Sequence, residues 1–300
     1  MSDIGFIGLG IMGKPMASHV VEGAKKGGYQ VWLHSRSGVP AELLEAGGKA
    51  CGSAKEVAQR AGIVILMVPD TPDVEKVLFA DNGAASGLSA GKTLVDMSSI
   101  SPIATRAFAE RIHSLGCDYV DAPVSGGELG ARSASLTIMA GGSTEAFERV
   151  KPLFELMGKN ITLVGGVGDG QTCKVANQII VALTIEAVSE AMLFAAKAGA
   201  DPSKVREALM GGFAGSRILE VHGERMLKRN FQPGFRIELH QKDLNLALEG
   251  ARSLGLSLPN TALAQQLFSA CVANGGRAWD HSAMVKALEL MAGYEIAPKA

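Results

Sequence analysis

The sequence predicts two domains: an α/β domain with a doubly wound parallel sheet over residues 1–164, and an all-α domain over residues 165–300. In the first half, short apolar runs alternate with segments of helical periodicity, a pattern typical of strand–helix–strand units. The glycine-rich segment Gly165–Gly170 ends this alternation. Beyond it we find no strand pattern, only helical segments separated by glycine and proline. The pattern in each half therefore predicts a separate domain.

Seven short apolar runs are the predicted strands. They are Ile4–Gly8, Gln30–His34, Ile63–Val68, Thr93–Asp96, Asp118–Ala122, Leu136–Ala140 and Ile161–Val164. The third and fourth runs are apolar on both faces, as buried parallel strands tend to be. Helix-period residues lie between strands, for example at Glu42–Leu44 and Val74–Phe79. Right-handed crossovers through such helices produce a doubly wound sheet of the Rossmann type.

The second half predicts helices only. Residues 171–197 contain neither proline nor glycine, which indicates one helix of about 27 residues, roughly 40 Å long. Further helices are predicted at Pro202–Met210, Ser216–Lys228, Leu239–Ser253, Thr261–Ala273 and Ser282–Met291.

Composition excludes several classes of function. The chain has 300 residues, 47% of them hydrophobic, and a net charge of −1. It has no block of like charges to attract nucleic acid or a membrane surface. The most membrane-like run, 175–185, is shorter than the roughly 20 apolar residues of a span. The start of the chain lacks a signal-peptide pattern, and the four cysteines are scattered. We expect a soluble, cytoplasmic protein with free thiols.

The segment Gly8-Leu9-Gly10-Ile11-Met12-Gly13 matches the dinucleotide-binding pattern G-x-G-x-x-G. The pattern alone is weak, because glycine occupies 37 of 300 positions, but here it follows an apolar strand and opens a predicted helix. The first glycine permits a tight turn, the second the approach of a pyrophosphate, and the third close helix packing. We predict that all six residues bind a dinucleotide; a tight turn without a ligand is the alternative.

The end of the second predicted strand favours NADP(H). NAD-specific sites place an acid there to bind the ribose hydroxyls. This chain instead has His34-Ser35-Arg36. Ser35 can donate a hydrogen bond, and the planar guanidinium of Arg36 can pair with a 2′-phosphate. NADP(H) is therefore favoured, NAD(H) stays possible, and the alternative is a solvated surface arginine.

Three further segments carry a family resemblance. They are Asp121-Ala122-Pro123-Val124-Ser125-Gly126-Gly127, then Gly168-x-Gly170-x-x-x-Lys174-x-x-Asn177-Gln178, then Lys242-Asp243-Leu244. With the N-terminal loop, they resemble the β-hydroxyacid dehydrogenases, a family that includes 3-hydroxyisobutyrate dehydrogenases and tartronate semialdehyde reductases. The resemblance covers essentially the whole chain. Within the family, Gly211–Ser216 and Asn230–Ile237 look most like the tartronate semialdehyde reductases.

The resemblance implies NAD(P)H-dependent reduction of tartronate semialdehyde to D-glycerate, a reversible reaction, with Lys174 as the catalytic lysine. Its ammonium group would donate a proton to the carbonyl oxygen as negative charge develops. A helix start and partial burial would both lower its pKa. The family commonly has Asn four residues after the lysine. Here Asn177 is third and Gln178 fourth, so either amide is a candidate for orienting the substrate hydroxyl.

Other roles also follow from the resemblance. Ser125, Gly126 and Gly127 would bind the substrate carboxylate, since a hydroxyl and glycine amides can form an anion cradle. Lys242 would reach the cofactor or substrate, and Asp243 would hold the arrangement in place. Adjacent residues do not share a helix face, so we do not expect a simple salt bridge between these two.

Val68, Pro69 and Ser99 match places where the family touches the cofactor, and Phe235 either packs beside the nicotinamide or belongs to the core. The six histidines show no metal-ligand spacing, so we predict no metal site. By resemblance we expect a homodimer or homotetramer that acts on a small carboxylate-bearing substrate and has no nucleic-acid or membrane partner.

Two alternatives remain open. Another 3-hydroxy acid, such as 3-hydroxyisobutyrate or serine, would make the protein a dehydrogenase of that acid. A non-catalytic dinucleotide-binding module would keep Gly8, Gly10 and Gly13 but have no need for Lys174, Ser125 and Lys242 together.

Overall fold

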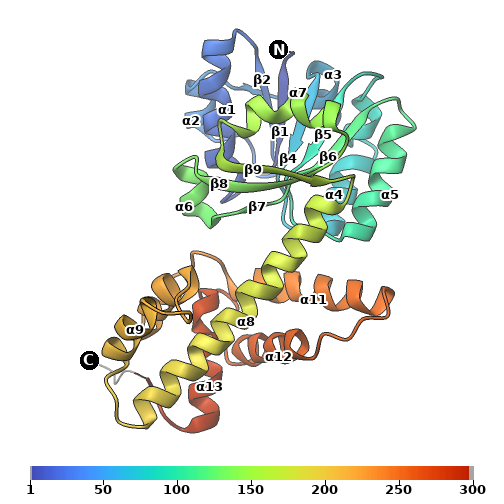
Figure 1. The fold of residues 1–300 in the computed structure, drawn as a ribbon. Helices are drawn as coiled ribbons and strands as arrows, with labels where there is room; N and C mark the ends of the chain where they lie inside the picture. The colour runs from blue at the N-terminus through green and yellow to red at the C-terminus, as the bar shows by residue number, and fades with distance from the viewer. Residues whose placement is uncertain (1, 297–300) are drawn as a thin grey trace. The chain divides into compact units, whose positions relative to one another are not determined.

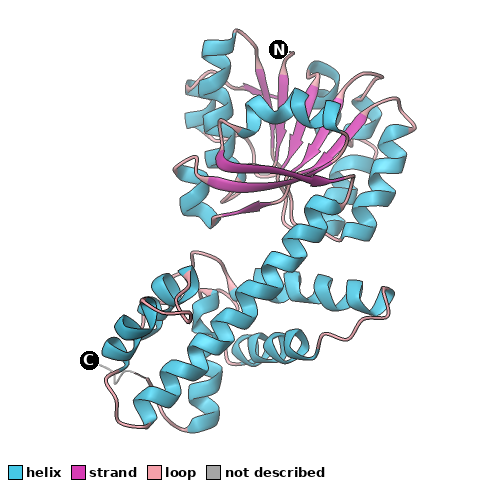
Figure 2. Ribbon diagram, in the orientation of Figure 1, coloured by secondary structure: helices cyan, strands magenta, loops and turns pink. Residues whose placement is uncertain are grey.

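The computed structural model describes residues 2–296, which form two compact units: unit 1 ends at Lys174 and unit 2 begins at Val175 (Figures 1 and 2). Unit 1 is an α/β unit and unit 2 is helical, so the predicted fold class is confirmed.

Unit 1 is built on a single sheet. Its strands are β1 (Ile4–Ile7), β2 (Val31–His34), β3 (Lys49–Ala50), β4 (Ile63–Leu66), β5 (Thr93–Asp96), β6 (Asp118–Asp121), β7 (Val124–Ser125), β8 (Leu136–Gly141) and β9 (Gly158–Gly165). All seven predicted strands are present, with slightly different ends. The two that were not predicted, β3 and β7, have two residues each, too few to leave a periodic pattern.

The strand order is β3-β2-β1-β4-β5-β6-β8-β7, with β9 also paired to β8. The first six strands are parallel and have the order of a Rossmann-type sheet. Strand β8 runs antiparallel to β6 and β7 and parallel to β9. The register pairs Asp96 with Asp121 at the carboxyl ends of β5 and β6.

Seven helices connect the strands of unit 1. They are α1 (Gly13–Gly27), α2 (Ala41–Glu45), α3 (Ala54–Arg60), α4 (Thr71–Phe79), α5 (Pro102–His113), α6 (Gly127–Arg132) and α7 (Thr144–Phe154), with a short 3₁₀ turn at Ala84–Gly87. The side chains of Ser53, Asp70, Ser101 and Ser143 accept backbone N–H groups at the starts of α3, α4, α5 and α7, which explains where these helices begin.

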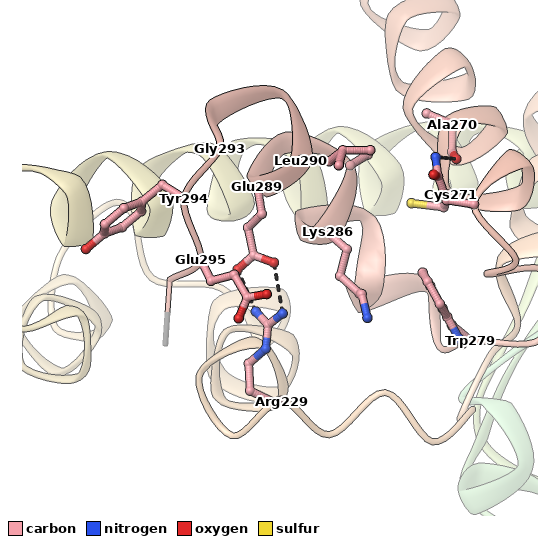
Figure 3. Close-up of a pocket in the computed structure, with 12 residues that line it drawn as sticks. Arg229, Ala270, Cys271, Trp279, Lys286, Glu289, Leu290, Gly293, Tyr294 and Glu295 are labelled. Atoms are coloured by element: carbon pink, nitrogen blue, oxygen red, sulfur yellow. Dashed lines mark hydrogen bonds and ion pairs between the residues drawn. The ribbon is translucent and has the colours of Figure 1, made fainter. Parts of the chain in front are cut away.

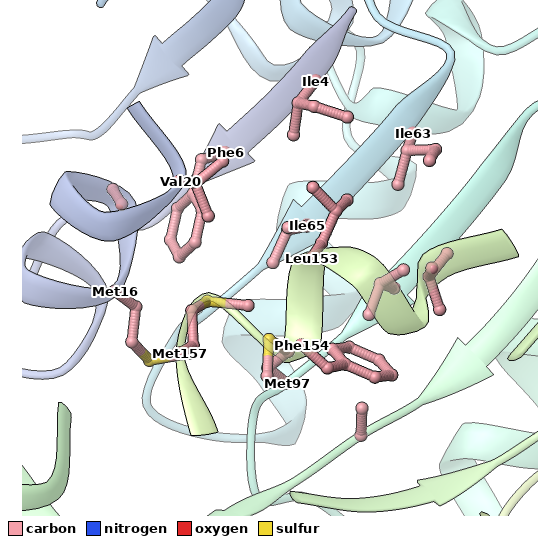
Figure 4. Close-up of a cluster of buried hydrophobic side chains, with 14 of the residues drawn as sticks. Ile4, Phe6, Met16, Val20, Ile63, Ile65, Met97, Leu153, Phe154 and Met157 are labelled. Carbon is pink, nitrogen blue, oxygen red and sulfur yellow. The ribbon is translucent and has the colours of Figure 1, made fainter. Parts of the chain in front are cut away.

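Successive side chains of a strand point to opposite faces of the sheet, and in the central strands both sets are apolar. Ile4 and Phe6 of β1 and Ile63 and Ile65 of β4 pack with residues of α1 and α7 in one core (Figure 4). Val64 and Leu66 of β4 point the other way and pack with α3, α4 and α5 in a second core. Helices therefore cover both faces, and the carboxyl ends of the parallel strands are the edge left for a ligand.

Helix α8 (Asp169–Lys197) begins in unit 1 and continues into unit 2. The other helices are α9 (Pro202–Met210), α10 (Glu224–Leu227), α11 (Ile237–Ser253), α12 (Pro259–Ala273) and α13 (Val285–Ala292), with a π turn at Leu219–Gly223 and a 3₁₀ turn at His281–Met284. The core of unit 2 includes Ile185, Met192, Leu244, Phe268 and Met284.

One predicted helix is less regular than expected. The predicted helix over 216–228 is present as continuous helical residues 217–227, but its middle, Leu219–Gly223, is a π turn that leads into α10. The Nε of Arg206 donates to the carbonyl of Leu219 at 3.0 Å, and its guanidinium also donates to the carbonyl of Glu220. A long-range partner takes up these two carbonyls, so the regular α-helical ladder is not required there.

Within the described residues, α8 is the one helix long and apolar enough to cross a membrane, with a mean hydropathy of 1.9 over its best window. About 44% of that window is buried within the fold. Core helices of soluble proteins meet the same criterion, so this is weak support for a membrane span.

Candidate active site

The predicted residues of unit 1 gather at the carboxyl edge of its sheet. Gly8–Gly13 follow β1, Ser35 and Arg36 follow β2, Val68 and Pro69 follow β4, and Ser99 follows β5. The segment Ser125–Gly127 comes after β6. Strands β1 and β4 are neighbours whose following helices cover opposite faces, which makes this edge the topological switch point where open α/β sheets bind ligands.

The packing of the fold itself requires the first and third glycines of the dinucleotide loop. Gly8 has φ +97°, and a Cβ there would overlap the carbonyl of Met67. A Cβ on Gly13 would overlap the carbonyl oxygen of Gly8. Gly10 is different: it is exposed, and nothing lies within 4 Å of the position its Cβ would occupy. The space at Gly10 fits a ligand that approaches the backbone closely.

The start of α1 also fits a phosphate group. Unlike α3, α4, α5 and α7, α1 has no side-chain cap and no acid in its first turn. Its first N–H groups therefore have no carboxylate or hydroxyl cap, and the positive end of the helix dipole favours an anion. Together with the opening at Gly10, this arrangement fits the pyrophosphate of a nicotinamide dinucleotide.

Arg36 lies on the surface beside the loop after β2. Its side chain is 73% exposed and pairs with Asp73 of α4 at 3.4 Å. Ser35 and Ser37 lie close, with 3.3 Å between their hydroxyl oxygens. Exposed ion pairs contribute about 0–1 kcal/mol, so a bound phosphate can displace Asp73 from the guanidinium at little cost.

A buried polar network joins the ends of β4, β5 and β6, and sequence reasoning missed it. Ser98 is fully buried; its Oγ accepts the N–H of Val68 at 3.0 Å, and its own N–H donates to Asp96 at 2.9 Å. The hydroxyl of Tyr119 donates to Asp96 at 3.2 Å. Burial raises the pKa of Asp96 and of Asp121 to about 6 in each case.

Lys174 lies in the second turn of α8 and is 7% exposed. One turn earlier, Gln171 and the start of the helix are hydrogen-bonded to the ends of β5 and β6. The predicted proton donor is thus attached, through its own helix, to the edge of the sheet where the dinucleotide loop lies. Lys174 was expected to be partly buried and to lie near a helix start. Both expectations hold, because its side chain is buried and α8 begins only five residues earlier.

Ser125, Gly126 and Gly127 form a sharp turn between β7 and α6. Gly126 has φ +130° and Gly127 φ +60°, conformations in which side chains other than glycine are strained. Ser125 pairs with Thr137 of β8 and is half-buried. Successive N–H groups in such a turn form an anion-binding concavity, which fits the expected carboxylate cradle.

In unit 2 the structure separates the two candidate amides. Gln178 is buried, and its side-chain amide donates to Oδ2 of Asp243 at 2.6 Å. The amide of Asn177 donates to Oε1 of Gln178 at 2.7 Å. Gln178 therefore joins α8 to α11 through a buried hydrogen bond, whereas Asn177 is only partly buried.

The expectation for Lys242 and Asp243 was wrong in one respect. Lys242 Nζ lies 3.0 Å from Oδ1 of Asp243, so the two adjacent residues do form an ion pair. The four-carbon stem of lysine is long enough to curve back along the helix, and both side chains are largely buried, which favours pairing.

Three histidines distant in sequence form a buried chain in unit 2. His240 Nδ1 and His281 Nδ1 are 2.9 Å apart, His281 Nε2 and His222 Nε2 are 3.1 Å apart, and His240 Nε2 donates to the carbonyl of Gln178 at 3.1 Å. Burial lowers the pKa of His222. Phe235 packs edge-on against the rings of His240 and His281, as a core phenylalanine would.

His222, His281 and Asp280 also lie close enough together to be candidate metal ligands, which sequence spacing could not reveal. However, Arg225 Nε lies 3.3 Å from Asp280 Oδ1. The carboxylate already accepts the N–H groups of Gly234, Phe235 and Ser282. A cation would have to compete with these donors, so the absence of a metal stays our prediction.

A pocket of about 430 Å³ lies in unit 2 (Figure 3). It contains the ion pair between Arg229 and the buried Glu289, and Lys286, whose ammonium lies 4.2 Å from the ring centre of Trp279. None of the predicted site residues lines it.

Comparison with known proteins agrees with the fold and the dinucleotide loop. Residues 3–166 match the NAD binding domain of 6-phosphogluconate dehydrogenase, and residues 168–288 match the NAD-binding domain of NADP-dependent 3-hydroxyisobutyrate dehydrogenase. The chain is 63% identical to 2-hydroxy-3-oxopropionate reductase of Escherichia coli K12 over 98% of this chain and 99% of the relative.

Solved structures are similar over nearly the full length. 3-Hydroxyisobutyrate dehydrogenase of Mycobacterium tuberculosis, solved with L-serine, has a TM-score of 0.84 at 29% identity and covers 96% of this chain and 99% of its own. The enzyme of that name from Salmonella typhimurium has a TM-score of 0.81 at 29% identity, with 95% and 99% covered. The chain therefore belongs to the 3-hydroxyisobutyrate dehydrogenase-related family of NAD(P)-dependent oxidoreductases.

Proposed function

We propose that the protein reduces tartronate semialdehyde (2-hydroxy-3-oxopropanoate) to D-glycerate with NADPH and catalyses the reverse oxidation. The observation that carries this proposal is the 63% identity, over nearly the whole of both chains, to the Escherichia coli reductase. The local geometry is compatible with it, because the buried Lys174 is tied to the sheet edge that also bears the dinucleotide loop.

In this proposal Lys174 is the general acid. When bound, the nicotinamide supplies the hydride that adds to the aldehyde carbon. The ammonium of Lys174 donates a proton to the carbonyl oxygen, which becomes the new hydroxyl, and the resulting amine regains a proton from solvent. Burial keeps bulk water away from the amine and strengthens its electrostatic interaction with the developing alkoxide.

The substrate carboxylate binds to Ser125, Gly126 and Gly127, whose turn offers a hydroxyl and backbone N–H groups to an anion. Asn177 orients the substrate hydroxyl, because the amide of Gln178 is already bonded to Asp243. Lys242 contacts substrate or cofactor, and Asp243 holds that ammonium in place through the ion pair at 3.0 Å.

The dinucleotide binds along the carboxyl edge of the sheet, against the loop Gly8–Gly13, Val68, Pro69 and Ser99. The 2′-phosphate pairs with Arg36 and accepts a hydrogen bond from Ser35, which makes NADP(H) the preferred cofactor. The exposed guanidinium and its weak partner Asp73 support this assignment.

We further propose a cytoplasmic homo-oligomer in which residues 1–164 bind the dinucleotide and the helical region 165–300 supplies the subunit contacts. Exposed apolar side chains on that region support the second part: Ile180, Phe194, Phe213, Leu290 and Met291. Burying such side chains between subunits removes apolar surface from water.

A panel of substrates with both cofactors tests the function. Absorbance of the reduced nicotinamide is followed with tartronate semialdehyde, D-glycerate, 3-hydroxyisobutyrate and serine. The proposal requires the highest kcat/KM for the tartronate semialdehyde–glycerate pair. Preference for 3-hydroxyisobutyrate or serine would assign the protein to another branch of the family. Tight NADPH binding without turnover on any of the four would instead indicate a non-catalytic binding module.

A further inference from the structure

We infer that Asp121 and Gln171 are positioning residues that fix Lys174 relative to the carboxylate-binding turn. The inference rests on the proposed role of Lys174 as proton donor. All the residues concerned lie in unit 1: at the ends of β5 and β6, in the carboxylate-binding turn, at the end of β8, and at the start and in the first two turns of α8.

Asp121 caps α8 from a distance. One carboxylate oxygen accepts the N–H of Gly168 at 2.7 Å and the other accepts the N–H of Gln171 at 2.8 Å. The caps of α3, α4, α5 and α7 come from residues next to each helix in sequence, whereas Asp121 is 47 residues before Gly168. A non-local cap attaches the helix to a particular strand and also completes its first turn.

Two glycines make room for this contact. A Cβ on Gly170 would lie 2.8 Å from Oδ2 of Asp121, and a Cβ on Gly141 would lie 2.7 Å from Oδ1. These distances are too short for carbon and oxygen, and each Cβ would also overlap a backbone carbonyl oxygen, of Met139 or of Gly166, so neither position admits a side chain while α8 lies this close to β6. The local sequence is thus suited to bringing α8 directly against the end of β6.

Gln171 makes the corresponding attachment to the segment that follows β5. Its side chain is fully buried; Oε1 accepts the N–H of Ile100 at 3.1 Å, and Nε2 donates to the carbonyl of Ser98 at 2.7 Å. Ser98 in turn holds the N–H of Val68 in the proposed cofactor loop. Lys174 follows Gln171 by three residues, and residues at that spacing are neighbours on a helix surface.

The attachment therefore links the proposed parts of the reaction. Asp121 is four residues before Ser125, which begins the carboxylate-binding turn, and its other contact is the helix that bears Lys174. Burying a carboxylate is costly unless hydrogen bonds compensate, and a serine next to the helix in sequence could complete its first turn without that cost. A buried Asp121 is explained if it fixes the distance between the Lys174 amine and the substrate, since catalysis is sensitive to displacements on the order of 1 Å.

The first test measures kcat, KM and the NADPH dissociation constant of Asp121→Asn and Gln171→Met. In the first variant an NH₂ group replaces one acceptor oxygen, and in the second both hydrogen bonds of the side chain are lost. We expect kcat to fall at least tenfold while the dissociation constant changes less than twofold. Asp118→Asn, at the exposed start of the same strand and outside the network, is the control and should keep the wild-type kcat.

The second test asks whether the loss acts through the lysine. In Lys174→Ala, added methylamine takes over proton donation from solution and is not held by α8. Asp121→Asn combined with Lys174→Ala should therefore be no slower than Lys174→Ala alone, with or without methylamine. If the effects of the two substitutions on kcat multiply, Asp121 acts independently of Lys174, and the inference is overturned.

Gln171→Glu provides a test that can be read even if the variant is less stable, because the pH dependence of kcat is measured. An ionised carboxylate keeps the acceptor for Ile100 but cannot donate to the carbonyl of Ser98; protonation restores the donor. Its kcat relative to wild type should recover as pH is lowered, whereas Gln171→Met should show no such recovery. A flat ratio would contradict the inference. Full activity in Lys174→Ala would instead refute the proposed role of Lys174 as proton donor. Wild-type kcat in Asp121→Asn together with an inactive Lys174→Ala would contradict only the inference about Asp121.

Discussion

Gln178 of α8 donates a 2.6 Å hydrogen bond to Asp243 of α11, and both side chains are buried. Asp243 also pairs with Lys242 on its own helix at 3.0 Å. Gln178, next to Asn177 in sequence, thus connects α8 and α11 and supplies one of the hydrogen bonds to the buried carboxylate of Asp243.

Removing Gln178 should therefore affect stability more than removing Asn177. Gln178→Leu leaves a buried carboxylate short of a donor, which costs about 1–3 kcal/mol of unfolding free energy. Asn177→Ala, at a partly buried position, should cost less than about 1 kcal/mol and instead raise KM for the substrate. Urea denaturation and steady-state kinetics measure the two effects; the reverse ranking of stabilities would contradict this assignment.

The dinucleotide loop offers a matched pair of glycine substitutions. Gly13→Ala places a methyl group against the carbonyl oxygen of Gly8 and should lower the melting temperature by several degrees. Gly10→Ala meets nothing within 4 Å, so the protein should fold as wild type, yet NADPH should bind at least tenfold more weakly. Calorimetry gives both quantities. Unchanged affinity in Gly10→Ala would mean that the pyrophosphate lies elsewhere.

Cofactor preference should depend on Arg36. Arg36→Ala removes a charged hydrogen bond to the 2′-phosphate, worth about 1.5–3 kcal/mol, so the ratio of kcat/KM for NADPH over NADH should fall about ten- to a hundredfold. Arg60→Ala is a suitable control, because Arg60 is a surface arginine paired with Glu56 on α3. An unchanged ratio in Arg36→Ala would leave this guanidinium as a surface charge without a role in cofactor choice.

Loss of the lysine should abolish most turnover. Lys174→Ala should fold as wild type and bind NADPH, while kcat falls about 10²–10⁴-fold, the usual contribution of general acid catalysis. Single-turnover measurements separate this loss from product release. Near-normal kcat would refute the assignment of the proton donor.

The buried Asp96 should make stability depend on pH. Its pKa is raised from 3.8 to about 6 by burial, so the folded state keeps a proton that the unfolded state releases. The free energy of unfolding should therefore fall as pH rises from about 4 to about 6, by on the order of 1–3 kcal/mol. Asp121, with a pKa also raised to about 6, acts in the same direction, whereas the lowered pKa of His222 acts oppositely.

Comparing wild type with Asp96→Asn isolates this contribution. Since the other groups are common to both proteins, the unfolding free energy of wild type should fall relative to that of Asp96→Asn between pH 4 and 6, and the difference should level off above. A difference independent of pH would show that Asp96 is ionised in the folded protein throughout this range.

Patterns repeated over several residues were predictable from the sequence. Short apolar runs predicted the seven longer strands, and the glycine loop predicted a dinucleotide site at the end of β1. Strands β3 and β7 escaped because two residues show no period. The ends of helices such as α7 depend on single caps like Ser143, which are easily overlooked in a serine-containing loop.

Contacts between distant residues were not predictable. The pairing of His240 with His281 and of Asp121 with Gln171 joins residues 41 and 50 positions apart, and no local pattern marks them. The ion pair of Lys242 with Asp243 was missed for a different reason: helix-face geometry describes where side chains start, and a lysine stem is long enough to depart from it.

The distant cap on α8 has a consequence for the order of assembly. The acceptor for its first amides belongs to β6, a strand held between β5 and β8, so the first turn is complete only once that part of the sheet exists. On the ribosome the N-terminal region emerges and folds first. When the rest of α8 folds, the acceptor for its first amides is therefore already in place. A chain that began near residue 165 would lack Asp121, so the first turn of α8 would fray.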